Sequence, residues 1–163
     1  MKYILLCMCL LSLLGCGTDT NTQQDTKPTT TANEQAKTEQ DARVMAAKQA
    51  LSSGDYAKAI EEATASIKDN PNNADAYSVR GFATALSGDT TKGLADTKKA
   101  YDLDPNNVAN YYNMAMVYKL QGQLNDSKQW FEKVLEKDPS NTWSVYGIAT
   151  IYADQGDDTK ALD

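Results

Sequence analysis

A fixed spacing of glycines and prolines is the feature that most constrains the fold. Four glycines follow one another at intervals of 34 residues: Gly54, Gly88, Gly122 and Gly156. Three prolines keep the same interval, each 17 residues after a glycine: Pro71, Pro105 and Pro139. A sequence period of this size is the signature of stacked helical repeats, in which each unit is a pair of short helices. We therefore expect an all-α solenoid of helical hairpins.

The glycines and prolines are expected to end helices. Glycine adopts the left-handed conformation at a helix C-terminus without strain, and the residue before a proline is pushed out of the α region. Asn73, which follows the first of these prolines, can then cap the next helix. The first helix is expected to begin near Thr38, as its N-cap, and to end at Gly54. The helices that follow are expected at about 57–69, 74–87, 91–103, 108–121, 125–137 and 142–155, with a short eighth from near Asp158.

The residues between these positions resemble the tetratricopeptide repeat. The third repeat fits best and places seven residues on the family's pattern: Tyr111, Met114, Ala115, Tyr118, Ser127, Phe131 and Pro139. The first repeat departs from it, because Arg43 takes the place of a large aromatic residue. The resemblance implies a domain over residues 38–163. Its repeats cover about 40–73, 74–107 and 108–141, with 142–163 incomplete, and they stack into a superhelix with a concave face.

In this family the concave face is lined mainly by first helices and receives peptides or protein segments. The matching positions give the candidate groove residues: Val44, Lys48, Ser78, Phe82, Tyr112, Asn113, Met116, Lys119, Tyr146 and Thr150. Ordinary packing between repeats is the alternative role for Phe82, Tyr112 and Met116. Some relatives hold a partner's C-terminal carboxylate in a Lys/Asn/Arg clamp. Only Lys48 and Asn113 have suitable chemistry at those positions, so the clamp is not supported.

The first 37 residues are expected to form an export signal and a tether. Lys2 precedes a twelve-residue apolar run, Tyr3 to Leu14, which is too short to span a membrane but suits a signal peptide over residues 1–15. The run ends in Leu-Leu-Gly-Cys, which resembles the bacterial lipobox and implies cleavage before Cys16 and a diacylglycerol on its sulfur. A simple secretory signal that contains cysteine is the alternative. Residues 16–37 are rich in threonine, which predicts a disordered linker beyond the lipidated cysteine.

Composition excludes several classes of function for the repeat domain. The net charge of −6 disfavours nucleic acid and adsorption to anionic lipid through a basic patch. The absence of histidine removes the commonest acid–base catalyst and metal ligand, and the three cysteines, Cys7, Cys9 and Cys16, all precede the domain. The calcium-like segment Asp102–Asn106 is explained by the turn between repeats. We expect no enzyme, no metal and no cofactor other than the acyl lipid on Cys16.

The last repeat is incomplete, since its second helix has room for only a few residues before Asp163. The helix before it carries four apolar residues that are expected to pack on the missing partner: Val145, Ile148, Ile151 and Tyr152. One hypothesis is that the natural protein is longer; the other is that this face docks a partner or a second copy.

The expected function is a membrane-anchored adaptor or scaffold of the bacterial envelope that binds a partner segment in the groove. The lipobox resemblance implies an exported lipoprotein, either on the periplasmic side or on the outer face of the cytoplasmic membrane. In a diderm host Gly17 after Cys16 resembles the outer-membrane default. The alternatives are a structural module that self-associates into a homo-oligomer through the C-terminal apolar face, and a non-catalytic fragment of a longer repeat protein.

Overall fold

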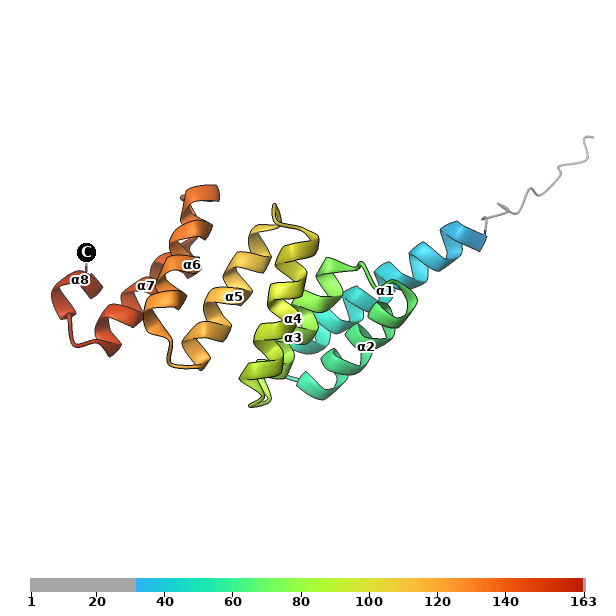
Figure 1. Ribbon diagram of the computed structural model, residues 1–163, viewed down its shortest axis with the longest axis horizontal. Helices are drawn as coiled ribbons and strands as arrows, with labels where there is room; N and C mark the ends of the chain where they lie inside the picture. Colours follow the sequence, from blue (N-terminus) through green and yellow to red (C-terminus); the bar gives the residue numbers. More distant parts are fainter. Residues whose placement is uncertain (1–31, 163) are drawn as a thin grey trace, which may run out of the picture. The chain divides into compact units, whose positions relative to one another are not determined.

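The computed structural model describes residues 32–162, which form eight consecutive α-helices and no β-strand (Figure 1). The helices are α1 (Ala32–Ser52), α2 (Tyr56–Asp69), α3 (Ala74–Leu86), α4 (Thr90–Leu103), α5 (Val108–Leu120), α6 (Leu124–Lys137), α7 (Thr142–Asp154) and α8 (Asp158–Leu162). The expected all-α array of helical hairpins is therefore confirmed. The predicted signal peptide, Cys16 and the linker as far as residue 31 lie outside the described residues.

The start of α1 differs from the expectation. The helix begins at Ala32 rather than near Thr38, so residues 32–37, assigned to the linker from composition, are helical. Thr38 is not an N-cap: it lies inside the helix, and its Oγ1 donates to the carbonyl of Glu34 at 2.8 Å. The segment contains alanine, glutamate, glutamine and lysine, which favour helix, and no glycine or proline to stop it. Among the described helices, neither α1 nor any other is long and apolar enough to cross a membrane.

The periodic glycines end the first helix of each pair, as expected. All four adopt positive φ angles: Gly54 (81°), Gly88 (106°), Gly122 (73°) and Gly156 (75°). The next helix then begins at a polar cap, such as Asp55 accepting from the amide of Lys58. After the prolines, Asn73 and Asn141 cap α3 and α7 by accepting from the amides of Ala76 and Ser144. These caps satisfy backbone N–H groups that the helix itself leaves unpaired.

Small residues set the distance between the two helices of a pair. In the second repeat, Gly81 of α3 faces Gly93 of α4 so closely that a Cβ on Gly93 would lie 2.6 Å from the Gly81 carbonyl oxygen. The equivalent place in the third repeat holds Ala115 and Ser127, and the Ser127 hydroxyl donates to the Ala115 carbonyl at 2.8 Å. Larger side chains at these positions would separate the helices, so the pattern specifies a closely packed hairpin.

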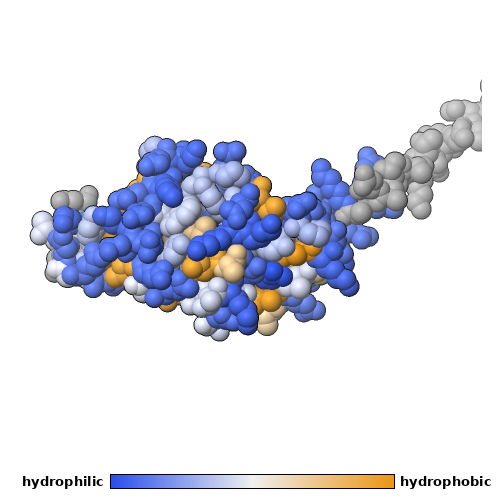
Figure 2. All heavy atoms as spheres, in the orientation of Figure 1, coloured by the Kyte–Doolittle hydropathy of each residue, from blue (hydrophilic) through white to orange (hydrophobic). Residues whose placement is uncertain are grey.

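Stacking places the first helices of the first three repeats against each other. Helix α1 contacts α3, and α3 contacts α5, whereas the second helices α2, α4 and α6 make no comparable contacts with one another. Helix α7 does not pack on α5 to the same extent, and Lys119 of α5 reaches it through Thr150. Helices that approach on one side and separate on the other form a curved array, so α1, α3 and α5 line its concave face. The surface seen in Figure 2 is mostly hydrophilic, with small separate hydrophobic patches.

The C-terminal repeat packs more completely than expected. Ile151 is fully buried with Phe131 and Ala115, and Ile148 packs against the same cluster. Gly147 makes this possible, because a Cβ there would lie 2.6 Å from the Phe131 ring. The expectation that all four apolar residues of this helix await a missing partner is therefore wrong for Ile148 and Ile151. Val145 does remain exposed.

Candidate binding groove

The candidate site is the concave face of α1, α3, α5 and α7. Its predicted residues occur as pairs four residues apart, which places both members on the same face of a helix. The pairs repeat every 34 residues: Val44 and Lys48, Ser78 and Phe82, Tyr112 and Met116, Tyr146 and Thr150. The structure brings residues of neighbouring first helices together. Asn113 Nδ2 donates to Ser78 Oγ at 2.8 Å, and Lys119 Nζ donates to Thr150 Oγ1.

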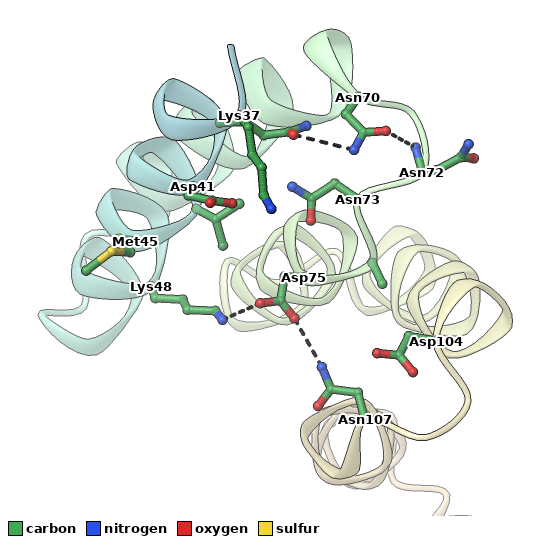
Figure 3. A pocket seen from close by; sticks show the side chains of 13 residues that line it. Lys37, Asp41, Met45, Lys48, Asn70, Asn72, Asn73, Asp75, Asp104 and Asn107 are labelled. Atoms are coloured by element: carbon green, nitrogen blue, oxygen red, sulfur yellow. Dashed lines mark hydrogen bonds and ion pairs between the residues drawn. The ribbon is translucent and has the colours of Figure 1, made fainter. Parts of the chain in front are cut away.

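A polar hollow of about 640 Å³ lies at the α1 end of this face (Figure 3). Its centre is Asp75, in the first turn of α3, whose two carboxylate oxygens serve different repeats. Lys48 Nζ of α1 lies 2.6 Å from Asp75 Oδ2, and Asn107 Nδ2, at the start of α5, donates to Asp75 Oδ1 at 3.1 Å. Lys37 and Asp41 of α1 also line the hollow. Asp75 thus links α3 to α1 and to the N-terminus of α5 inside the hollow.

The middle of the concave face is less open to a ligand than the sequence suggests. Tyr112 and Met116 are half-buried and pack against the cluster around Phe131, with the Tyr112 and Phe131 ring centroids 5.7 Å apart in an edge-on arrangement. Burial raises the pKa of the Tyr112 hydroxyl. Val44 and Ser78 are buried, and Phe82 is half-buried. Packing between repeats therefore accounts for much of the surface of Tyr112 and Met116.

The predicted polar residues of α5 are already engaged. Asn113 is bonded to Ser78, as described, and Lys119 lies 4.0 Å from Asp154 as well as bonding to Thr150 on α7. These contacts link α5 to α3 on one side and to α7 on the other. A ligand that used either side chain would have to compete with these contacts.

An aromatic hollow of about 370 Å³ lies on α7. It is lined by Thr142, Trp143 and Tyr146. The side chains of Trp143 and Tyr146 are 69% and 65% exposed, far more than the other aromatic candidates of the groove. Their spacing of three residues puts them on one face, a turn apart. Of the predicted groove residues, Tyr146 is therefore the aromatic one most open to a ligand.

Sequence reasoning missed Trp143 and Asp75. Both belong to a third set of residues at the 34-residue step, three positions before the first member of each pair: Asp41, Asp75, Ala109 and Trp143. The period that identified the other candidates would have found this set too. Within residues 32–162, no group of three or more acidic residues, cysteines or histidines is arranged to hold a metal ion.

Two sequence profiles of the tetratricopeptide repeat family match the chain, one at residues 44–108 and one at 97–129. No curated protein matches the sequence. Among solved structures, the chain is similar to the second tetratricopeptide repeat domain of human RPAP3, determined in complex with an HSP70 peptide. The identity is 24% and the TM-score 0.63, over 71% of this chain and 97% of that one.

Two further structures share the fold. The first such domain of Spaghetti (RPAP3), bound to an HSP90 peptide, is 18% identical with a TM-score of 0.65, over 73% of this chain and 94% of that one. A tetratricopeptide repeat protein of Thermus thermophilus is 18% identical with a TM-score of 0.67, over 76% of this chain and 69% of that one. At these identities the likeness shows the arrangement of helices and leaves the ligand open.

Proposed function

This chain is a tetratricopeptide repeat protein, and on that premise we propose that it is a membrane-anchored adaptor of the bacterial envelope. It holds a segment of a partner protein in the concave groove. The observation that carries the proposal is the segregation of charge in the last repeats. The inner helices α5 and α7 contain one charged residue each, Lys119 and Asp154, whereas the outer helix α6 between them contains six.

This segregation suits an inner surface that meets another protein. Packing between repeats covers much of α5, whereas the exposed face of α7 would gain from charged residues if it faced only water. Instead α7 presents Trp143 and Tyr146, residue types that supply large rigid contact areas with a polar tip. The peptides bound by the related RPAP3 domains support the same kind of ligand for this groove.

The membrane anchor is the second part of the proposal. Cleavage before Cys16 and acylation of the cysteine would give two or three acyl chains, enough to hold a protein stably where one chain binds only marginally. The domain would then face the periplasm, or the outside of the cytoplasmic membrane, and recruit an envelope protein. A structural module that self-associates through the C-terminal face is the alternative, favoured by the exposed Val145 (53%) beside the aromatic residues of α7.

Chemical crosslinking of the full chain in the host bacterium, followed by purification and mass spectrometry, tests the groove. We expect one envelope protein to be captured, and its capture to fall at least tenfold in Tyr146→Ala. Val145→Ala is the matched control, because it removes an exposed apolar side chain from another side of the same helix. Capture that is equal in Tyr146→Ala and wild type would refute the groove. Self-crosslinks alone, lost in Val145→Ala, would favour the alternative.

Membrane fractionation of Cys16→Ser tests the anchor. The variant is expected to lose acylation, detected with a palmitate analogue, and to retain its unprocessed leader. An acylated, correctly processed Cys16→Ser protein would refute lipidation at this cysteine.

A further inference from the structure

On the basis of the proposed peptide-binding function, we infer that the aromatic hollow on α7 binds an uncharged, proline-containing segment of the partner in the polyproline II conformation. The hollow is open, since Trp143 and Tyr146 expose most of their surface. None of its three lining residues carries a charge. It therefore offers ring faces to an apolar ligand and gives no ionic partner to a charged one.

Each of the three hydrogen-bonding groups of the hollow can donate. The Trp143 indole N–H can only donate, and the hydroxyls of Thr142 and Tyr146 can do so as well. Within the described part of the chain, none of these three groups makes a hydrogen bond to another residue. A proline segment has the complementary inventory: each residue presents a carbonyl acceptor, and proline has no N–H to satisfy. The backbone of a polyproline II helix is also fully available, because it makes no internal hydrogen bonds.

Other common modes of peptide recognition do not fit this hollow. Addition of a β-strand requires a sheet edge, and residues 32–162 contain no strand. Recognition of acidic or phosphorylated motifs requires a cluster of basic residues, and none lines the hollow. A helical ligand needs a row of open apolar sites over two turns, yet the nearest candidates on α5, Tyr112 and Met116, are half-buried in inter-repeat packing.

A second copy of the chain is a poorer occupant than a short peptide. A Trp or Tyr side chain buries about 150–250 Å² when fully covered. At exposures of 69% and 65%, Trp143 and Tyr146 together offer roughly 200–350 Å². A stable protein–protein interface buries about 800 Å² on each partner. The hollow is therefore too small to hold a dimer by itself, whereas a segment of a few prolines would cover it.

The test is titration of the full chain in detergent micelles with a capped decaproline peptide, followed by NMR of the indole N–H signals. The chain has two tryptophans, so Trp130, which packs against Tyr101 and Tyr111, serves as an internal reference. We expect the Trp143 signal to shift in a saturable manner while the Trp130 signal stays in place. Tyr146→Ala should weaken binding at least tenfold, and Val145→Ala should leave it unchanged.

Several outcomes would overturn the inference. These are an equal response to an uncharged glycine-serine peptide of the same length, no shift at millimolar decaproline, or Trp143 shifts that depend on protein concentration because copies associate. The proposed function fails separately. If crosslinking captures a partner through Tyr146 but decaproline does not bind, the groove function is supported and the polyproline inference is refuted. If no partner is captured while decaproline still binds, the adaptor function is refuted and the polyproline II site on α7 is supported.

Discussion

Replacement of Gly93 by alanine tests the closest helix contact in the array. An added Cβ would lie 2.6 Å from the Gly81 carbonyl oxygen, 2.7 Å from Ala85 Cβ and 2.9 Å from the Ala85 amide nitrogen. Ordinary contacts begin near 3.4 Å. Two of the three obstacles are backbone atoms and the third is a Cβ, so no side chain can rotate away. The helices α3 and α4 must therefore move apart by about the difference between these distances and 3.4 Å.

Two opposing effects determine how far Gly93→Ala changes the free energy of unfolding. Overpacking of this kind costs typically about 1–3 kcal/mol. Alanine also favours helix over glycine by about 1 kcal/mol, which offsets part of the strain. We expect the strain to win, because separation also loosens Thr97 and Ala100, which are fully buried on α4. The net loss in the free energy of unfolding is therefore up to about 2 kcal/mol, which corresponds to a fall in Tm of up to roughly 10 °C for a domain of this size.

Urea unfolding of the full chain, followed by circular dichroism, measures the difference in the free energy of unfolding. Ala95→Gly is the matched control, because Ala95 is exposed on the same helix and the change isolates helix propensity. It should destabilise by about 1 kcal/mol. If Gly93→Ala instead raised the stability by a similar amount, propensity alone would account for both variants, and the close approach of α3 and α4 would be wrong.

Three further predictions concern charged and ionisable groups. Arg80→Ala should destabilise by about 2 kcal/mol in urea unfolding, because it breaks a two-bond contact with Asp96 (2.7 and 2.8 Å) that is mostly buried. Asp75→Ala should lower the free energy of unfolding by less than about 1 kcal/mol in the same measurement, because its ion pair with Lys48 is about half exposed to solvent; an equal loss in both variants would contradict this reasoning. Burial raises the pKa of the Tyr112 hydroxyl. Its contribution to stability is therefore complete below the unfolded pKa of about 10 and is lost as pH rises through the folded value. Tyr112→Phe should reduce the alkaline loss of stability, and an unchanged pH profile would contradict this expectation.

The sequence predicts the helices well because their ends are set locally. Positive φ at Gly54 and its periodic equivalents, and the asparagine caps after the prolines, depend on a few neighbouring residues. The start of α1 was misplaced for the converse reason. No residue between Ala32 and Thr38 forbids or requires helix, so composition alone gave the wrong boundary.

The groove was predictable as a set of positions but not as a surface. The period identifies which face of a helix a residue occupies, yet burial depends on the residue that meets it from another repeat. Ser78 is covered because Asn113 reaches it, and Tyr112 is held edge-on against Phe131. Tyr146, which occupies the position of Tyr112 in the next repeat, stays exposed. Such differences arise between helices and cannot be found from the period of one chain segment.

The set that begins at Asp41 shows how the groove changes along the array. The same position holds an acid in α1, the bridging Asp75 in α3, a small Ala109 in α5 and Trp143 in α7. Since these residues occupy equivalent places, a segment laid along the concave face would pass from a charged end, where lysine and aspartate are paired, to an uncharged aromatic end. Binding in the reverse direction would place apolar residues in the polar hollow and leave charges against the rings, where nothing pairs with them. The position-by-position change therefore favours one orientation of a bound segment, with its uncharged part on α7.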